Sequence, residues 1–171
     1  MPDTLLVGYA SQSGSTEEAA EFIALNLAEY GYMIDLLSVN YIRKLTGYRL
    51  IVLGAPLYYS HLHRDMRRFL KAHQSELAAT PVAFYALGPV HKTDEEYNGA
   101  KNQLAKELAK LNWFKPFDVQ LFTGMIDPAK LGFPYKLIPR IRELEMTDER
   151  NWDQISAWVE SLAKTLENDT F

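Results

Sequence analysis

Short apolar runs along this chain alternate with longer segments in which apolar residues recur at helical spacing. Five runs predict strands, at residues 5–7, 33–37, 50–53, 81–87 and 117–123. Helical spacing follows the first, third and fourth runs and returns in the last segment of the chain. Strands that alternate with helices favour a parallel sheet with helices on both faces. We therefore expect an α/β fold with a doubly wound, five-stranded parallel sheet.

Turn and capping residues predict where several elements begin and end. Gly31 follows the first helical segment, where glycine commonly ends a helix. Gly54-Ala55-Pro56 is expected to end the third strand, because proline cannot donate a ladder hydrogen bond. Thr93 and Glu96 form a capping-box pattern before the third helical segment, and Thr147 is expected to cap the final helix.

Residues 11–16 combine a flexible turn with a cluster of hydroxyl groups. Four hydroxyl side chains stand within these six positions, and Gly14 supplies the backbone freedom of a tight strand-to-helix turn. Unpaired amides and the dipole of a helix start favour an anion there, so the segment is interpreted as a phosphate-binding turn. The alternative is that Ser15 is merely an N-cap, with Glu18 completing a capping box. A P-loop lysine and a three-glycine dinucleotide motif are both missing.

Composition limits the classes of protein to consider. The 171 residues, 47% hydrophobic and 23% charged, suit one soluble globular domain. The chain has no cysteine, which excludes disulfides, thiol catalysis and thiolate metal sites. The net charge of -4 does not indicate nucleic-acid binding, and no apolar run predicts a membrane span or signal peptide, so a cytoplasmic protein is expected.

Residues 125–146 are expected to form an inserted flap between the last strand and the last helix of a single domain, residues 1–171. Three prolines punctuate this segment, Pro128, Pro134 and Pro139. Its apolar residues are Phe133, Tyr135, Leu137, Ile138 and Ile141, beside the bases Lys136, Arg140 and Arg142. One interpretation is a loop and short helix packed on the domain. The other is a basic, amphipathic flap for a large hydrophobic acid or for peripheral contact with a membrane.

The loop of residues 11–16 resembles the Ser/Thr-x-Thr-Gly-x-Thr loop with which flavodoxins hold the phosphate of FMN. Residues 54–63, residues 83–87 and the last helix with Trp152 extend the similarity over nearly the whole chain. The chain resembles the flavodoxin-like family that includes the menaquinone-dependent protoporphyrinogen oxidases. This resemblance implies FMN as the cofactor and the strand order 2-1-3-4-5, with the ligand beyond the carboxyl ends of the strands.

Three loops are therefore expected to converge on the cofactor. The predicted cofactor-binding residues are Ser11, Gln12, Ser13, Gly14, Ser15, Thr16, Ala55, Pro56, Leu57, Tyr58, Tyr59, Ser60, Leu87, Gly88, Pro89 and Val90. The first loop serves the phosphate, and Tyr58 and Tyr59 offer aromatic faces for the flavin ring. Backbone amides of residues 57–60 and 88–90 are expected to donate to the ring. No catalytic acid or base is assigned.

Basic residues and two histidines follow the third strand. His61, His63, Arg64, Arg67 and Arg68 could form an electropositive mouth for substrate carboxylates or an acidic partner. The alternative is a solvated helix face with no role. No metal is expected, because the two histidines are two positions apart and no carboxylate completes a site.

These patterns support an FMN-binding oxidoreductase, with a pure electron carrier left open. The narrower alternative, which the resemblance implies, is the oxidation of protoporphyrinogen with electrons passed to a membrane quinone. A non-catalytic domain on the same fold is the third hypothesis, although the third strand lacks the aspartate of a phosphorylatable receiver. The partner is then a redox protein, a small-molecule substrate or a quinone, and the oligomeric state stays open.

Overall fold

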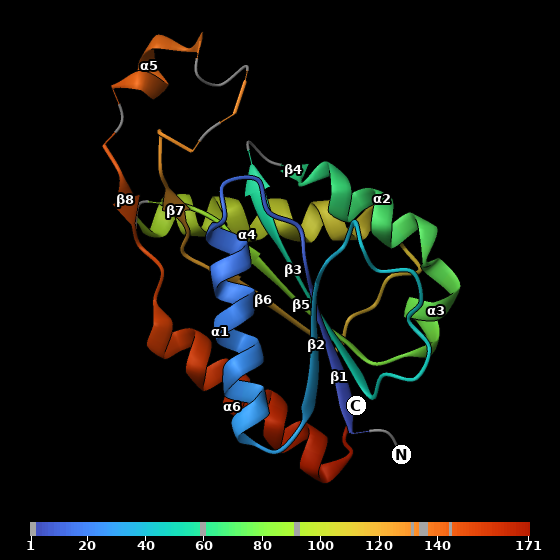
Figure 1. Cartoon of the computed structure of the whole chain (residues 1–171). Coiled ribbons are helices and arrows are strands. Elements are labelled where there is room, and N and C mark those ends of the chain that lie inside the picture. Colours follow the sequence, from blue (N-terminus) through green and yellow to red (C-terminus); the bar gives the residue numbers. More distant parts are fainter. Residues whose placement is uncertain (1–2, 59–60, 91–92, 131, 134–136, 144) are drawn as a thin grey trace.

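A computed structural model describes residues 3–58, 61–90, 93–130, 132–133, 137–143 and 145–171, with the backbone alone for residues 141–142. Five parallel strands form the sheet in the order β2-β1-β3-β5-β6, and β4 (His61–Leu62) pairs antiparallel with β3 (Figure 1). Their bounds are β1 Thr4–Tyr9, β2 Met33–Ser38, β3 Leu50–Tyr58, β5 Val82–Leu87 and β6 Asp118–Phe122. Counted among the parallel strands alone, this is the expected order 2-1-3-4-5. The predicted fold class is confirmed.

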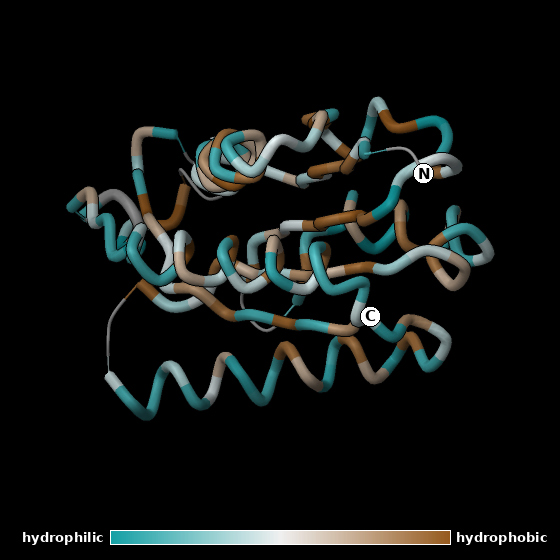
Figure 2. Tube along the Cα trace, turned by 90° about the horizontal axis from the view of Figure 1, so that it is seen from below, coloured by the Kyte–Doolittle hydropathy of each residue, from teal (hydrophilic) through white to brown (hydrophobic). Residues whose placement is uncertain are grey.

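Helices cover both faces of the sheet. One hydrophobic core lies between the sheet and two helices, α1 (Ser15–Glu29) and α6 (Trp152–Asn168). The opposite core is closed by α2 (Arg64–Ala72), α3 (Gln74–Ala79) and α4 (Asp94–Ala109). In Figure 2 the strands carry long hydrophobic stretches, while the helices alternate between hydrophobic and hydrophilic residues, as amphipathic helices on a buried sheet should.

Side-chain alternation along β1 shows how one apolar run serves both cores. Leu5 and Val7 pack with α1 and α6, whereas Leu6 packs with the core on the other face. All three side chains are fully buried. Successive side chains of a strand point to opposite faces, so a continuous apolar run is what a central parallel strand requires.

The prediction that Gly54-Ala55-Pro56 ends the third strand is wrong, since β3 continues to Tyr58. Pro56 pairs with Leu87 of β5, and its carbonyl accepts a hydrogen bond from the amide of His63 at 3.2 Å. The polar backbone atoms of Pro56 therefore face the side where β1 has already ended. A missing amide proton on that side does not interrupt the ladder with β5, so the proline is tolerated.

The start of α1 also differs from the capping-box alternative. Gly14, with a φ of 90°, is the N-cap residue, and no side chain caps the helix. Ser15 is the first helical residue instead of the cap, because the left-handed turn at Gly14 shifts the helix start by one position. At the other end Gly31, also at φ 90°, follows the helix as predicted. The predicted cap at Thr93 is confirmed, since its hydroxyl accepts from the Glu96 amide at 3.3 Å.

Residues 125–146, the flap, leave the sheet after β6. Its base is a two-stranded sheet of β7 (Met125–Ile126) and β8 (Thr147–Asp148), and its short helix is α5 (Pro139–Arg142). The prediction that Thr147 caps the last helix is wrong, because Thr147 pairs with Ile126. Asn151 caps α6 instead, and its side chain accepts from the Gln154 amide at 3.1 Å. Part of the predicted basic, amphipathic face of the flap lies outside the described residues. The structure describes neither residues 134–136 nor the side chains of residues 141–142.

Within the described ranges, no helix is both long and apolar enough to cross a membrane.

Candidate functional site

The turn from β1 into α1 presents uncapped amides at the carboxyl edge of the sheet. The first amides of a helix have no intrahelical acceptor, and here no side chain of the described residues caps the helix. The hydroxyl of Ser11 folds back within the turn and accepts from the Gly14 amide at 3.0 Å. A Cβ added at Gly14 would meet nothing within 4 Å, so the turn lies open on that side. An anion is the ligand that such an open helix start favours.

Thr16 carries the sharpest sign of a missing partner. Its side chain is fully buried, and its hydroxyl oxygen Oγ1 has no hydrogen-bond partner among the residues that the structure describes. An unsatisfied buried hydroxyl costs about 1–3 kcal/mol, so native proteins rarely keep one without a reason. The Thr16 carbonyl is held from below by the hydroxyl of the fully buried Tyr85, at 3.4 Å. A phosphate oxygen bound in the turn is a suitable acceptor for the Thr16 hydroxyl.

Both acids in the first turn of α1 are occupied by other groups. Glu17 accepts the hydroxyl of Tyr9 at 2.6 Å, and Glu18 pairs with Arg150 at 2.7 Å. Burial, together with the neighbouring Glu17 carboxylate, raises the pKa of Tyr9 to about 12, so this hydroxyl keeps its proton at neutral pH. Arg150 also donates to the Ser15 carbonyl at 3.2 Å. The charge of Glu18 is thus paired with Arg150, while the Glu17 carboxylate is held by a hydrogen bond from the neutral Tyr9 hydroxyl.

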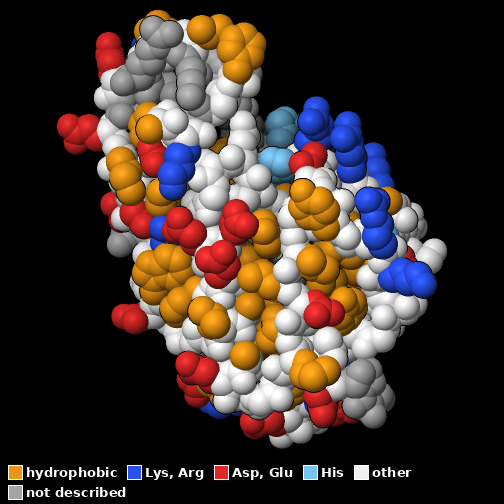
Figure 3. Space-filling view, in the orientation of Figure 1, with side chains coloured by type: hydrophobic (Ala, Val, Ile, Leu, Met, Phe, Trp, Pro, Cys, Tyr) orange, Lys and Arg blue, Asp and Glu red, His pale blue; other side chains and the backbone are white. Residues whose placement is uncertain are grey.

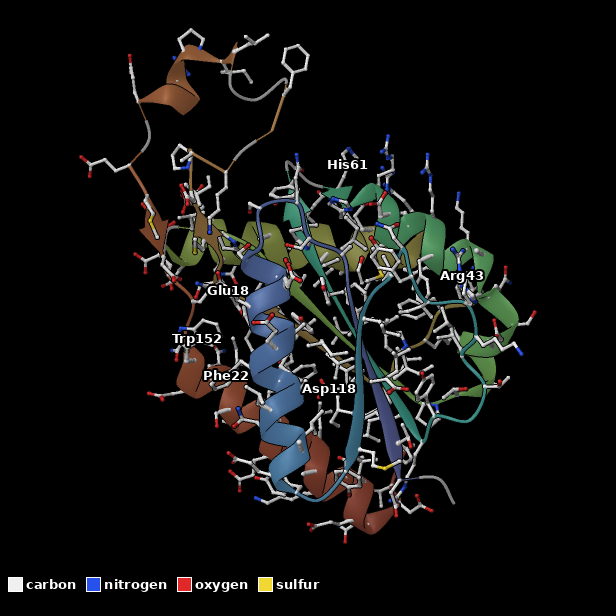
Figure 4. The ribbon with its side chains drawn as sticks, viewed as in Figure 1. Glu18, Phe22, Arg43, His61, Asp118 and Trp152 are labelled. Carbon is white, nitrogen blue, oxygen red and sulfur yellow. The ribbon has the colours of Figure 1, made fainter. Side chains whose placement is uncertain are left out.

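A cleft of about 690 Å³ begins beside this turn. It is lined by Ser11, Gln12, Tyr58, His61, Leu62, His63, Arg64, Asp65 and Arg67. The first loop, the end of β3, β4 and the start of α2 therefore share one cavity. Figure 4 labels His61 beside the start of α2. The volume falls within the range of small-molecule and cofactor sites.

The predicted residues after β3 and β5 reach the site unequally. Tyr58 is half-buried and lines the cleft, while Tyr59 and Ser60 lie outside the described residues. The side chains of Ala55 and Leu87 are packed in the two cores. Pro56 is buried within β3, and Leu57 is half-buried in the same strand. From these strands, Tyr58 is the side chain best placed to cover a flat ring.

The loop after β5 offers fewer donors than expected. The amide of Gly88 is bound to the Phe122 carbonyl at 2.8 Å, and Pro89 has no amide proton and accepts from Gly124 at 3.1 Å. Val90 is half-buried, and its amide is the remaining candidate of the three residues 88–90. The expectation that this whole run donates to a flavin is corrected on that point, because β6 and the start of the flap use its polar groups.

The two histidines of the cleft have different roles. His63 is the N-cap of α2, and its Nδ1 accepts the Asp65 amide at 3.2 Å. Burial lowers the pKa of His63, and Arg64 and Arg67 lower it further, against the opposite effect of Asp65. His61 lies in β4, with its Nδ1 3.3 Å from the carboxylate of Glu107. Both rings line the cleft, and neither belongs to a metal cluster, since the described residues contain no group of three ligating side chains.

Basic side chains follow the rim of the cleft along α2. Arg64 and Arg67 line the cavity, whereas Arg68 lies outside it on the exposed face of the same helix. Figure 3 shows the Lys and Arg side chains as a row beside the pale-blue histidines. Arg64 is 72% exposed and only loosely paired with Asp65, at 3.8 Å. The row therefore presents positive charge to anything that enters the cleft from solvent.

Sequence analysis missed two residues that hold the site together. Glu107 lies on the apolar face of α4 and reaches His61, and its position between Leu104 and Leu108 at helical spacing was a usable signal. Arg150 joins the start of α1 to the base of the flap, and its position in the sequence carried no signal of this contact. Leu62 and Asp65, which line the cleft, were likewise not predicted.

Comparisons with known proteins agree with this fold. A family profile described as a flavodoxin domain matches residues 6–150. The chain is 25% identical to "Protoporphyrinogen IX dehydrogenase [quinone]" of Escherichia coli K12 over 96% of this chain and 97% of that protein. In fold it resembles a flavodoxin from the domain Archaea, with a TM-score of 0.57 at 15% identity, covering 96% of this chain and 99% of that one. It also resembles oxidised flavodoxin 1 from Bacillus cereus, with a TM-score of 0.56 at 19% identity over 96% and 97% of the two chains.

Proposed function

This chain belongs to the flavodoxin domain family, and on that premise we propose that it is an oxidoreductase that binds FMN without a covalent bond. The observation that carries the proposal is the unpartnered hydroxyl of Thr16 at an uncapped helix start. Ser13, Ser15 and the first amides of α1 would share the phosphate with Thr16, and Tyr58 would cover the ring. Bound FMN supplies one-electron and two-electron transfer, for which this cysteine-free chain has no redox side chain of its own.

The turn fits a phosphate that is held by dipoles rather than by bases. Residues 1–42 contain no Lys or Arg, so charge neutralisation comes from amides, hydroxyls and the helix dipole. Glu18 is paired with Arg150 and so repels the anion less than a free carboxylate would, and Glu17 is held by a hydrogen bond from Tyr9.

A second, narrower function is favoured by one comparison. The likeness to the quinone-dependent protoporphyrinogen IX dehydrogenase of E. coli extends over 96% of this chain, well beyond the phosphate turn. The arginines at the cleft are suited to the carboxylates of a porphyrinogen. We infer that a porphyrinogen is the first substrate to test, with a quinone as electron acceptor. Appearance of porphyrin fluorescence only when FMN protein and quinone are both present would support this function.

The FMN proposal is tested by a titration that separates the phosphate from the ring. Apoprotein is titrated with FMN and with riboflavin, which lacks the phosphate, and flavin fluorescence is recorded. In Thr16→Val the lost charge-assisted hydrogen bond should weaken FMN binding about 10–100-fold and leave riboflavin binding unchanged. The apoprotein should be as stable as wild type or more stable, because the unsatisfied buried hydroxyl has gone.

Thr165→Val serves as the matched control. The Thr165 hydroxyl donates to the Ser161 carbonyl on the exposed side of α6, far along the chain from the turn. This variant should bind both flavins as wild type does. Wild-type protein that retains no FMN and does not quench its fluorescence would refute the proposed function, and equal FMN affinity in Thr16→Val would refute the role of the turn.

A further inference from the structure

The buried carboxylate of Glu107, behind the cleft, contacts His61, one of the two histidines that line the cleft. Glu107 belongs to α4, and its side chain is only 3% exposed. It accepts the Leu62 amide at 3.3 Å through Oε2, and through Oε1 it meets both Lys110 and the Nδ1 of His61, the latter at 3.3 Å. Burial alone would raise the pKa of Glu107, but the hydrogen bonds from Lys110, the Leu62 amide and His61 outweigh it, and the pKa lies below its ordinary value. The carboxylate is therefore ionised at neutral pH.

An ionised carboxylate determines which nitrogen of the neutral His61 ring carries the proton. A carboxylate can only accept, so the contact with Glu107 requires the proton on Nδ1. The second nitrogen, Nε2, has no hydrogen-bond partner among the described residues. The His61 side chain is 61% exposed and lines the cleft beside Gln12 and Tyr58. His61 thus offers the cleft a free nitrogen in a defined protonation state.

The other ionisable groups of the cleft are less suited to moving a proton. His63 is engaged through Nδ1 as the cap of α2, and burial disfavours its charged form. The side chains of Arg64 and Arg67 are hydrogen-bond donors without an acceptor atom, and Asp65 is bound by Asn40 at 3.1 Å. The groups that surround His61 are then Glu107 on α4, Lys110 at the C-cap of that helix, Asp65 and the two arginines on α2, and Tyr58 at the end of β3.

We propose that His61 is the proton-transferring residue of the cleft and that Glu107 is its positioning residue. This inference rests on the proposed flavin function. Bound FMN would supply the transfer of two electrons and one proton in each half of the reaction. When an organic substrate loses two hydrogens, the neutral Nε2 of His61 takes up the other proton, and when a quinone is reduced to the hydroquinone, Nε2 gives that proton back. The proton that His61 accepts in the first half is the one it returns in the second.

The first measurement needs no turnover. Nitrogen-15 NMR of the apoprotein reports which ring nitrogen of neutral His61 is protonated. Wild type should show the proton on Nδ1, and Glu107→Gln should move His61 toward the Nε2-protonated form that the isolated ring prefers. His73 is the matched control, since it makes a similar contact with Glu76 at 2.7 Å but lies away from the cleft lining. Its signals should not change in Glu107→Gln.

The second measurement follows one half-reaction with a defined probe. Photoreduced FMN protein is mixed with menadione, a soluble quinone, under anaerobic conditions, and reoxidation of the flavin is recorded between about pH 5 and 8, where histidine titrates. Wild type should slow as the pH rises, because the protonated ring is the donor. His61→Gln should react about 100-fold more slowly, a factor at the lower end of what a positioned acid–base group contributes. The variant should also lose the dependence of the rate on pH. His73→Gln should behave as wild type.

The outcomes separate this inference from the proposed function. If wild type and His61→Gln bind FMN equally and reoxidise at the same rate with the same pH profile, His61 transfers no proton and the inference fails while the flavin function stands. If Glu107→Gln leaves the ring tautomer and the pH profile unchanged, Glu107 does not position His61. Recovery of the rate of His61→Gly on addition of free imidazole would support the role of the ring itself. Wild-type protein that binds no FMN would overturn the proposed function directly.

Discussion

Arg150 joins two parts of the molecule through one nearly buried side chain. The guanidinium, 4% exposed, contacts Asp148 through two nitrogens at 2.9 and 2.6 Å and Glu18 at 2.7 Å, and lies 4.7 Å from the centre of the Trp152 ring. It also reaches the Ser15 carbonyl. These contacts connect the base of the flap to the helix start that we assign to the phosphate. The planar fork of arginine makes them simultaneously, which a lysine could not do.

The Arg150 pair predicts a pH dependence of stability. The hydrogen bonds from Arg150 outweigh the opposing effect of desolvation and hold the pKa of Asp148 below its ordinary value of 3.8. Because the folded-state pKa is depressed, the stabilisation is fully present above the unfolded-state pKa and is lost as the pH falls through the folded-state pKa. Asp148→Asn should therefore lower the free energy of unfolding at pH 7 by about 1–2 kcal/mol, a discounted figure because Asp148 is 35% exposed.

Urea unfolding at several pH values checks this expectation. The difference between wild type and Asp148→Asn should stay constant from pH 7 down to the ordinary pKa and shrink in more acidic solution. Glu167→Gln, at an exposed position of α6, is the control and should stay within about 0.5 kcal/mol of wild type throughout. A difference that persists unchanged into strong acid would show that the Asp148 charge contributes nothing through Arg150.

At the scale of elements, β3 and β5 depend on a glycine that faces a buried tyrosine. A Cβ added at Gly54 would lie 2.0 Å from Cζ and 2.2 Å from the hydroxyl oxygen of Tyr85. Tyr85 is fully buried, among Phe122 and Trp158, so its ring has no room to withdraw. Its hydroxyl supports the Thr16 carbonyl, and packing at β3 is thereby coupled to the phosphate turn.

Two glycine substitutions should consequently have opposite effects. Gly54→Ala should destabilise the fold by about 3 kcal/mol, the upper end of typical overpacking, and should weaken FMN binding because Tyr85 is displaced. Gly99→Ala lies in the exposed interior of α4, where an added Cβ meets nothing within 4 Å, and should stabilise by about 0.5–1 kcal/mol. Chemical denaturation measures the free energy of unfolding of both variants, and titration measures their affinity for FMN. A Gly54→Ala protein as stable as wild type would mean that Tyr85 can repack.

Elements were predictable wherever local periodicity decides them. The five parallel strands and the helices α1, α2, α4 and α6 follow from apolar runs and helical spacing, whereas α3 was not predicted. The predicted end of α1 at Gly31 and cap at Thr93 are confirmed. The two errors, at Pro56 and Thr147, have a common cause. In each case the neighbouring strand, absent from local sequence, determined the outcome: β1 had already ended beside Pro56, and β7 was available to pair with Thr147.

At the scale of the whole molecule, charge is divided between the two sides of the cleft. Residues 1–42 carry six acids and no Lys or Arg, whereas residues 43–72 carry seven bases and one acid. The fold places the first group around α1 and much of the second along α2, so that the cleft opens between them (Figure 3). An anionic molecule should therefore approach from the side of α2.

Reversal of that charge should affect anionic reactants alone. We expect the triple variant Arg64→Glu, Arg67→Glu, Arg68→Glu to slow reoxidation of the reduced protein by anthraquinone-2-sulfonate about 10-fold at low ionic strength, with the difference closing at high salt. Neutral menadione should react at the wild-type rate. The rates are measured by stopped-flow absorbance at several salt concentrations.

A second triple variant controls for net charge. Lys101→Glu, Lys106→Glu and Lys115→Glu change the charge by the same amount at exposed positions on and after α4. This protein should keep the wild-type rate with both quinones. Equal slowing by the two triple variants would show that overall charge, and not the row on α2, governs the approach of an anion.

The candidate site shows where prediction from sequence ends. The turn at residues 11–16 was identified correctly as a helix start rich in hydroxyls, and Tyr58, His61, His63, Arg64 and Arg67 all line the cleft beside it. Strand and helix spacing, glycine positions and hydroxyl clusters are local properties, because they depend on residues within a few positions of one another. They were sufficient for the layers, for the parallel sheet and for the edge of the sheet where a ligand would bind.

Tertiary structure alone decided which distant groups meet there. His61 meets Glu107 from 46 positions away, and Arg150 meets Ser15 from 135 positions away. A periodic pattern records that a face is buried but not which partner buries it, so neither contact could be read from the chain. The same holds for Thr16, whose hydroxyl is common in any turn. Only the tertiary structure shows that the Thr16 hydroxyl is buried without a hydrogen-bond partner among the described residues, and that Tyr85 binds the Thr16 carbonyl.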